Sequence, residues 1–86
     1  MGYRVEFTST AIEGLENLPP TIQERILRKL RWLSENFEEV SPQSLSANLS
    51  NLFKLRVGDY RILYSFDIEM KLITIHKIGH RRDVYD

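Results

Sequence analysis

The sequence predicts an α+β fold with the element order β-α-α-β-β-β, in which an antiparallel, partly mixed curved sheet packs against two N-terminal helices. Apolar and polar residues alternate near the N-terminus and again over most of 53–78, as in strands with one buried face. Between these stretches, apolar residues recur every three or four positions, as in amphipathic helices. The 86 residues leave room for one core, so we expect a single domain over 1–86.

The N-terminal half is predicted to hold one strand and two helices. Residues 3–7 alternate in polarity and predict the strand, while the hydroxyl residues at 8–10 can cap a helix from about 9 to 17. Pro19 and Pro20 end that helix, because a residue before proline leaves the α region. Proline also suits the first turn of the second helix, whose apolar stripe runs through 22–37.

Basic side chains of the second helix fall largely off its apolar stripe. They are Arg25, Arg28, Lys29 and Arg31. A solvated helix face has this composition, and a surface that binds a partner is the alternative. The sequence leaves both interpretations open.

The C-terminal half is predicted to hold three strands joined by short turns. Residues 38–51 are rich in Ser, Pro, Gln and Asn and are expected to form a loop. Gly58 and Asp59 predict a tight hairpin, and residues 67–70 the next turn. The strands are expected at 53–57, 60–66 and 72–78. We expect no helix after the last strand.

Composition excludes several classes of protein. The absence of cysteine rules out a disulfide scaffold and a zinc–thiolate site, and it suits a reducing cytosol. No apolar run approaches the ~20 residues of a membrane span, and the alternating N-terminus differs from a signal peptide, so we expect a cytoplasmic protein. The net charge is zero, with five basic and seven acidic residues in 1–51 and seven basic and five acidic in 52–86, or −2 against +2.

Several familiar kinds of active site are also missing. The four glycines are isolated and form no phosphate loop, and neither a GxSxG nor an HExxH motif occurs. His76 and His80 lie four apart on a predicted strand and its exit, where two ring nitrogens do not converge on one metal. We therefore expect no metal site and no cofactor.

Basic residues do recur on the C-terminal strands. Lys54 and Arg56 share one face of their strand, and Arg61 follows the hairpin and can face that pair. If the sheet curls, residues after the last strand can join them in one cationic patch. These residues are His80, Arg81, Arg82 and Tyr85.

Such a patch suits the cleavage of an RNA phosphodiester. Attack by the 2′-hydroxyl needs a base, cations around the pentacoordinate phosphate and an acid at the leaving 5′-oxygen. Guanidinium groups bind phosphate bidentately without a metal, and aromatic rings can stack on unpaired bases. The alternative is that the cations only solubilise the strands and Tyr85 only packs.

The residues named above resemble those of the RelE/ParE toxin superfamily, the small toxins of type II toxin–antitoxin pairs. The resemblance covers nearly the whole chain and is sharpest in Lys-Leu-Arg-Val-Gly-Asp-Tyr-Arg-Ile-Leu-Tyr at 54–64 and Ile-Gly-His-Arg-Arg-Asp-Val-Tyr at 78–85. It implies a RelE-like fold and a RelB-like antitoxin partner. Because the sequence contains no apolar span and no DNA-recognition motif, we expect no membrane contact and no contact with DNA except through the antitoxin. RelE-like members cleave messenger RNA, typically in the ribosomal A site and without a metal, whereas ParE-like members inhibit DNA gyrase.

The resemblance also implies roles for individual residues. Arg61 and Arg81 match the arginines that stabilise the transition state, and Tyr85 matches a tyrosine that stacks on the substrate base or helps activate the 2′-hydroxyl. Lys54 is the further candidate for catalysis. The candidates for binding RNA phosphates are Arg56, His80 and Arg82, and the resemblance leaves open whether His80 is instead a general acid or base.

This chain departs from the family pattern in ways that keep alternatives open. The best-known ribosome-dependent members are strongly basic, whereas this chain is neutral, which weakens its expected attraction to ribosomal RNA. The segment 81–85 is shorter than in some members. A ParE-like toxin that inhibits gyrase, and a degenerate toxin that only binds antitoxin, remain the alternatives.

Overall fold

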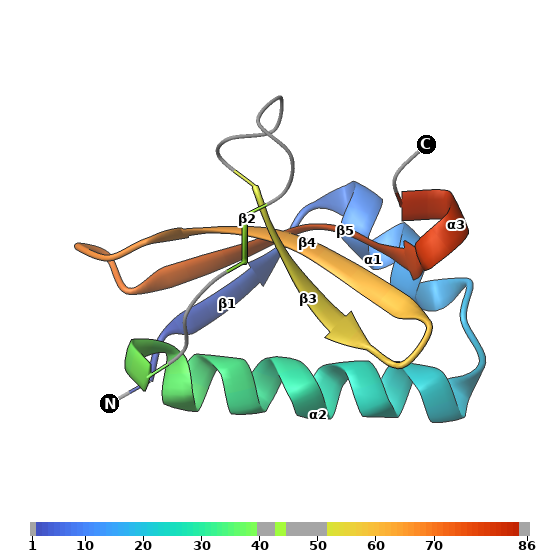
Figure 1. Cartoon of the computed structure of the whole chain (residues 1–86), viewed down its shortest axis with the longest axis horizontal. Helices are drawn as coiled ribbons and strands as arrows, with labels where there is room; N and C mark the ends of the chain where they lie inside the picture. Colours follow the sequence, from blue (N-terminus) through green and yellow to red (C-terminus); the bar gives the residue numbers. More distant parts are fainter. Residues whose placement is uncertain (1, 40–42, 45–51, 85–86) are drawn as a thin grey trace.

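The computed structural model describes residues 2–39, 43–44 and 52–84, and Figure 1 traces how their elements are arranged. The helical elements are α1 (Ser9–Glu16), α2 (Pro20–Asn36), the 3-10 turn η1 (Phe37–Glu39) and α3 (Arg81–Val84). The strands are β1 (Arg4–Phe7), β2 (Gln43–Ser44), β3 (Phe53–Val57), β4 (Tyr60–Asp67) and β5 (Leu72–His80). No helix among these residues is long and apolar enough to cross a lipid bilayer.

The strands form one mixed sheet in the order β1-β5-β4-β3-β2. β1 pairs with β5 in parallel, and the other neighbours are antiparallel. The predicted α+β class, the β-α-α-β-β-β order of the main elements and the partly mixed sheet are therefore confirmed.

Two expectations for the chain outside these main elements were wrong. β2 lies inside the predicted loop 38–51, where it pairs with the first two residues of β3. A strand of two residues is too short to show a period in the sequence. A one-turn helix, α3, follows the last strand, and a tertiary contact anchors it because the backbone N–H of Arg81 donates to the carbonyl of Asp59 at 2.9 Å.

α1 lies along β5 beyond the point where β1 ends. Thr8 caps the helix by accepting a hydrogen bond from the N–H of Ala11 at 3.1 Å, and its hydroxyl donates to the carbonyl of His76 at 3.2 Å. At Gly14, an added Cβ would overlap the carbonyl oxygen of Ile78. Glycine therefore lets the helix pack against the backbone of β5, which covers part of that strand's edge.

α2 crosses one face of the sheet and supplies most of the helical side of the core (Figure 1). Its buried residues are Ile26, Leu30 and Leu33. Their partners in the sheet include Ile62, Tyr64, Ile73, Ile75 and Ile78. Because side chains alternate along a strand, the residues between these partners lie on the face turned away from α2, which we call the outer face.

Candidate functional site

Basic side chains gather on the outer face near the hairpin that joins β3 to β4. Arg56 lies directly opposite Arg61, so both side chains are on the outer face. In the next row, Leu63 lies between Lys54 on one neighbouring strand and Lys77 on the other. We call these four cations, Lys54, Arg56, Arg61 and Lys77, the basic cluster.

Backbone oxygens at the hairpin hold the two arginines in place. Nη1 of Arg61 donates to the carbonyl oxygens of Gly58 at 3.0 Å and Tyr60 at 3.1 Å, and Nε of Arg56 approaches the same Gly58 oxygen at 3.4 Å. Gly58 has a φ of 58°, a left-handed conformation that glycine adopts without strain. The turn thus gathers two guanidinium groups at one carbonyl, although like charges that face each other across strands repel.

The basic cluster is not neutralised within the described part of the chain. The ion pairs found there join Arg4 to Glu6 and Arg28 to Glu24, and neither includes a member of the basic cluster. The same residues contain no group of three acidic, His or Cys side chains that could hold a metal ion. Unpaired cations side by side form a site for an anion with distributed charge, such as a phosphodiester.

His80 is not brought to the basic cluster. It lies opposite Tyr60, with ring centroids 5.6 Å apart, on the side of the sheet that faces α2. The N–H of Arg82 donates to Nδ1 of His80 at 3.3 Å. Because Nδ1 accepts, the neutral ring carries its proton on Nε2.

The other predicted site residues follow β5. Arg81 and Arg82 are exposed on α3, and the hydrogen bond from Arg81 to Asp59 starts this helix beside the β3–β4 hairpin. Their backbone is thus close to the end of the sheet that carries Arg61. Tyr85 lies outside the described residues.

The structure adds two residues that the sequence reasoning did not place in the site. Lys77 belongs to the basic cluster, and Nε2 of His76 lies 2.7 Å from Oγ of Ser65, also on the outer face. His76 is on this face because it directly follows the inward-facing Ile75, whereas Lys77 is there because a register shift beside Leu63 breaks the alternation of β5. The signal in the sequence was the spacing of Ile75 and Ile78, two buried residues three apart within one strand.

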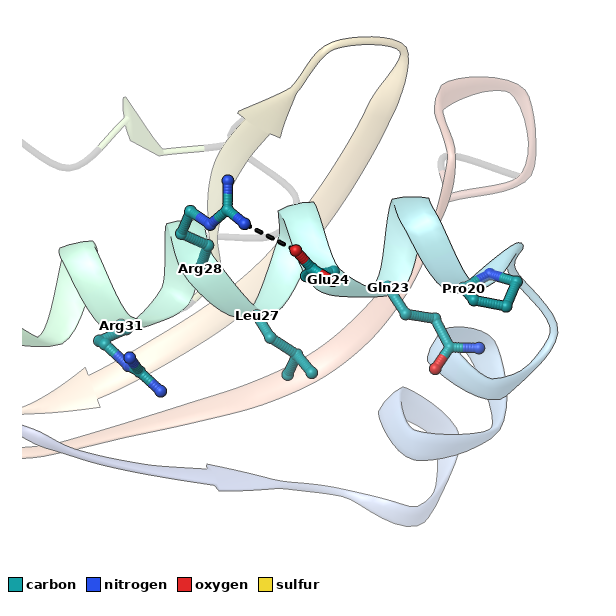
Figure 2. Close-up of a pocket in the computed structure, with 6 residues that line it drawn as sticks. All are labelled: Pro20, Gln23, Glu24, Leu27, Arg28 and Arg31. Atoms are coloured by element: carbon teal, nitrogen blue, oxygen red, sulfur yellow. Dashed lines mark hydrogen bonds and ion pairs between the residues drawn. The ribbon is translucent and has the colours of Figure 1, made fainter.

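A shallow pocket of about 500 Å³ lies elsewhere, on the exposed side of α2 (Figure 2). Within it, Nη2 of Arg28 donates to Oε1 of Glu24 at 2.7 Å, one turn away. This pair neutralises part of the pocket, and no member of the basic cluster lines it. It is therefore separate from the candidate site.

Known proteins resemble this chain over almost its whole length. Residues 5–85 match the family described as the ParE toxin of the type II toxin–antitoxin system parDE. Toxin RelG of Mycobacterium tuberculosis is 36% identical over 86 residues, which cover 99% of this chain and 98% of RelG.

Solved structures show the same architecture. The toxin–antitoxin complex RelBE2 from M. tuberculosis contains a chain that superposes with a TM-score of 0.84 at 34% identity, covering 96% of this chain and 95% of that one. Isolated Escherichia coli RelE superposes with a TM-score of 0.75 at 22% identity, covering 96% and 90%, and shares the fold. The RelE-like fold is thus confirmed, and the chain belongs to the RelE/ParE superfamily as a RelE-like toxin of a type II toxin–antitoxin system.

Proposed function

We propose that this toxin is an endoribonuclease that cleaves messenger RNA, in association with the ribosome, and so inhibits translation. Residues 1–86 act as a single toxin domain in the cytoplasm. The observation that carries the proposal is the basic cluster, a set of cations on one sheet face that form no ion pair among the described residues. The membership of the chain in the RelE/ParE superfamily supports it.

The proposed reaction is a metal-independent transesterification. The 2′-oxygen of one nucleotide attacks the adjacent phosphorus and loses its proton to a general base, the bond to the 5′-oxygen breaks, and that oxygen gains a proton from a general acid. The products are a 2′,3′-cyclic phosphate and a 5′-hydroxyl end. Charge builds up on the phosphate oxygens in the transition state, and fixed guanidinium groups stabilise it there.

Each candidate residue has a proposed part in this reaction. Arg61 and Arg81 stabilise the transition state, while Lys54 and Tyr85 act as the general base or stack on a base of the RNA. Arg61 is suited to its part because two backbone carbonyls already orient its guanidinium. The residues proposed to bind flanking phosphates are Arg56, His80 and Arg82, and we add Lys77 because of its place in the basic cluster.

A cognate RelB-like antitoxin is the proposed protein partner. The solved relatives include the RelBE2 toxin–antitoxin complex from M. tuberculosis and the RelE–RelB complex from Pyrococcus horikoshii. We propose that the antitoxin docks on α2 and an open sheet edge and covers or distorts the basic cluster. Contact with DNA then comes only through the antitoxin.

A ParE-like inhibitor of DNA gyrase is the second candidate function. The observation that favours it is the match of residues 5–85 to the family described as the ParE toxin. Assays of gyrase supercoiling and of messenger RNA integrity, performed with the same purified protein, separate the two. Gyrase inhibition with intact messenger RNA would replace the nuclease proposal.

The nuclease proposal is tested by Arg61→Ala and Arg81→Ala. We expect each variant to lower the cleavage rate about 10²- to 10³-fold, the loss that follows removal of one donor to a developing oxyanion. Arg31→Ala is the control, because Arg31 is exposed on α2 away from the basic cluster, and it should cleave at the wild-type rate. Primer extension on messenger RNA in translating extract measures the rate, and circular dichroism verifies folding. Unchanged cleavage in both active-site variants would refute the proposal.

A further inference from the structure

A second basic surface lies between α2 and the end of β3. It is a groove of about 520 Å³, and four of its lining side chains are cationic while none is acidic. The residues that form its charged and aromatic wall are Arg25, Arg28, Lys29, Trp32 and Arg56. We call it the α2–β3 groove.

Most of the charge in this groove is unpaired within the described residues. Arg28 is bound to Glu24, but no ion pair found there includes Arg25, Lys29 or Arg56. The groove therefore retains a net positive charge, although the whole chain is neutral. Charge complementarity favours a polyanion as its occupant.

An exposed aromatic ring distinguishes this groove from an ordinary basic helix face. The side chain of Trp32 remains 45% exposed although it is large and apolar. Nζ of Lys29 lies 4.3 Å from the centre of its ring, in a cation–π contact. Unpaired cations beside an accessible aromatic ring are the elements with which proteins bind single-stranded nucleic acids, by phosphate contacts and base stacking.

The α2–β3 groove is continuous with the basic cluster through the β3–β4 hairpin. Arg56 lines the groove and also lies opposite Arg61 on the outer face. Gly58 joins the two regions. Its carbonyl oxygen accepts hydrogen bonds from Arg56 and Arg61. The guanidinium of Arg25 also lies beside it, so close that a Cβ at position 58 would be 3.3 Å from Nη2 of Arg25. Guanidinium groups thus follow one another around the hairpin from α2 to the outer face.

We propose that the RNA strand held on the basic cluster continues over the β3–β4 hairpin into the α2–β3 groove. There, Arg25 and Lys29 bind its phosphates, and one base stacks on Trp32. The inference rests on the proposed function in one respect, that the substrate is RNA. An acidic protein segment would satisfy the charges but would need neither the aromatic ring nor the connection to the basic cluster.

The groove is tested with two RNAs that carry 2′-O-methyl groups and cannot be cleaved, one of about 4 and one of about 12 nucleotides. Trp32 is the only tryptophan of the chain, so intrinsic fluorescence reports directly on the groove. We expect the long RNA to quench this fluorescence and the short RNA to leave it unchanged. Trp32→Leu should weaken the binding of an end-labelled long RNA about tenfold. Trp32→Phe keeps an aromatic ring and should bind this RNA nearly as tightly as the wild type does.

The phosphate contacts are tested separately by salt dependence. The double variant Arg25→Ala/Lys29→Ala should reduce the slope of log K against log salt for the long RNA by about 1.4, or about 0.7 for each lost contact. Its slope for the short RNA should match that of the wild type. Arg31→Ala removes one positive charge from the same helix at a residue that does not line the groove, and in Figure 2 its side chain extends below α2 whereas that of Arg28 extends above it, so this control should bind both RNAs as the wild type does.

The outcomes distinguish this inference from the proposed function. If the groove variants lose equal affinity for the short and long RNAs, the proposal that RNA enters the groove is wrong. The same holds if Trp32 fluorescence responds to poly-glutamate but not to the long RNA. Neither result would bear on messenger RNA cleavage. A wild-type protein that cleaves no messenger RNA, but whose groove variants lose long-RNA binding as described, would support the groove and refute the nuclease.

Discussion

At the scale of single residues, the buried phenol of Tyr64 makes stability depend on alkaline pH. Burial raises the pKa of Tyr64 from 10.0 to about 12. Since the folded pKa is the higher one, the stabilisation is complete below pH 10 and is lost as the pH rises through 12. A shift of two units corresponds to about 2 to 3 kcal/mol. Urea unfolding from pH 8 to 12 should therefore show a shallower loss of stability for Tyr64→Phe than for the wild type.

The comparison with the wild type is needed because other groups also titrate in this range. Those groups are present in both proteins, so the difference between the two pH profiles isolates the Tyr64 phenol. Parallel profiles from pH 8 to 12 would show that its ionisation is not linked to unfolding.

At the scale of elements, residues on the apolar stripe of α2 stabilise the fold by packing against the sheet, and residues off the stripe contribute little to stability. Leu33 is 0% exposed in the core, whereas Leu27 is 46% exposed on the same helix. Leu33→Ala should lower the free energy of unfolding by about 2 to 5 kcal/mol, because it removes buried methyl groups and leaves a cavity. Leu27→Ala should change it by less than about 0.5 kcal/mol.

The two variants form a matched pair. Both replace leucine by alanine within α2, so the change in helix propensity is the same and the difference reports burial. The midpoints of urea unfolding measure it, provided that the slopes agree. Equal losses would mean that α2 does not pack against the sheet by this face.

At the scale of the whole molecule, the small core makes the toxin sensitive to its partner. A chain of this size buries only about 60% of the surface of its unfolded state, so its stability is modest. If the proposed antitoxin binds only the folded toxin, a concentration of 100 times Kd stabilises it by about 2.7 kcal/mol. The thermal midpoint should then rise by more than about 10 °C.

Differential scanning calorimetry of the toxin with and without the antitoxin measures this shift. An unrelated acidic protein at the same concentration is the control and should leave the midpoint unchanged. An unchanged midpoint in a verified complex would mean that the antitoxin binds the folded and unfolded toxin equally.

Local patterns were sufficient for the main elements of the fold. Strands 53–57 and 60–66 and the hairpin between them were predicted because alternation and a glycine turn act over a few residues. The same alternation predicts that Arg61 faces the strand that carries Arg56, and the register of β3 and β4, which places Arg56 opposite Arg61, confirms it. The parallel pairing of β1 with β5 left no such signal, because its partners lie about 68 positions apart in the chain.

On β5, the local alternation does not predict which face of the sheet each side chain occupies. Regular alternation from Ile75 would have turned Lys77 toward α2 and His80 toward the outer face. The register shift beside Leu63 reverses both, because one extra residue on a strand exchanges the faces of everything that follows.

The sequence by itself determined the α+β order, the family and most of the cations of the site, since these depend on residue type and short-range period. The tertiary structure decided which of those cations share a face, and it alone joined the α2–β3 groove to the basic cluster. The physical reason is that the face of a side chain is set by strand register and by packing between distant segments, neither of which a local period records.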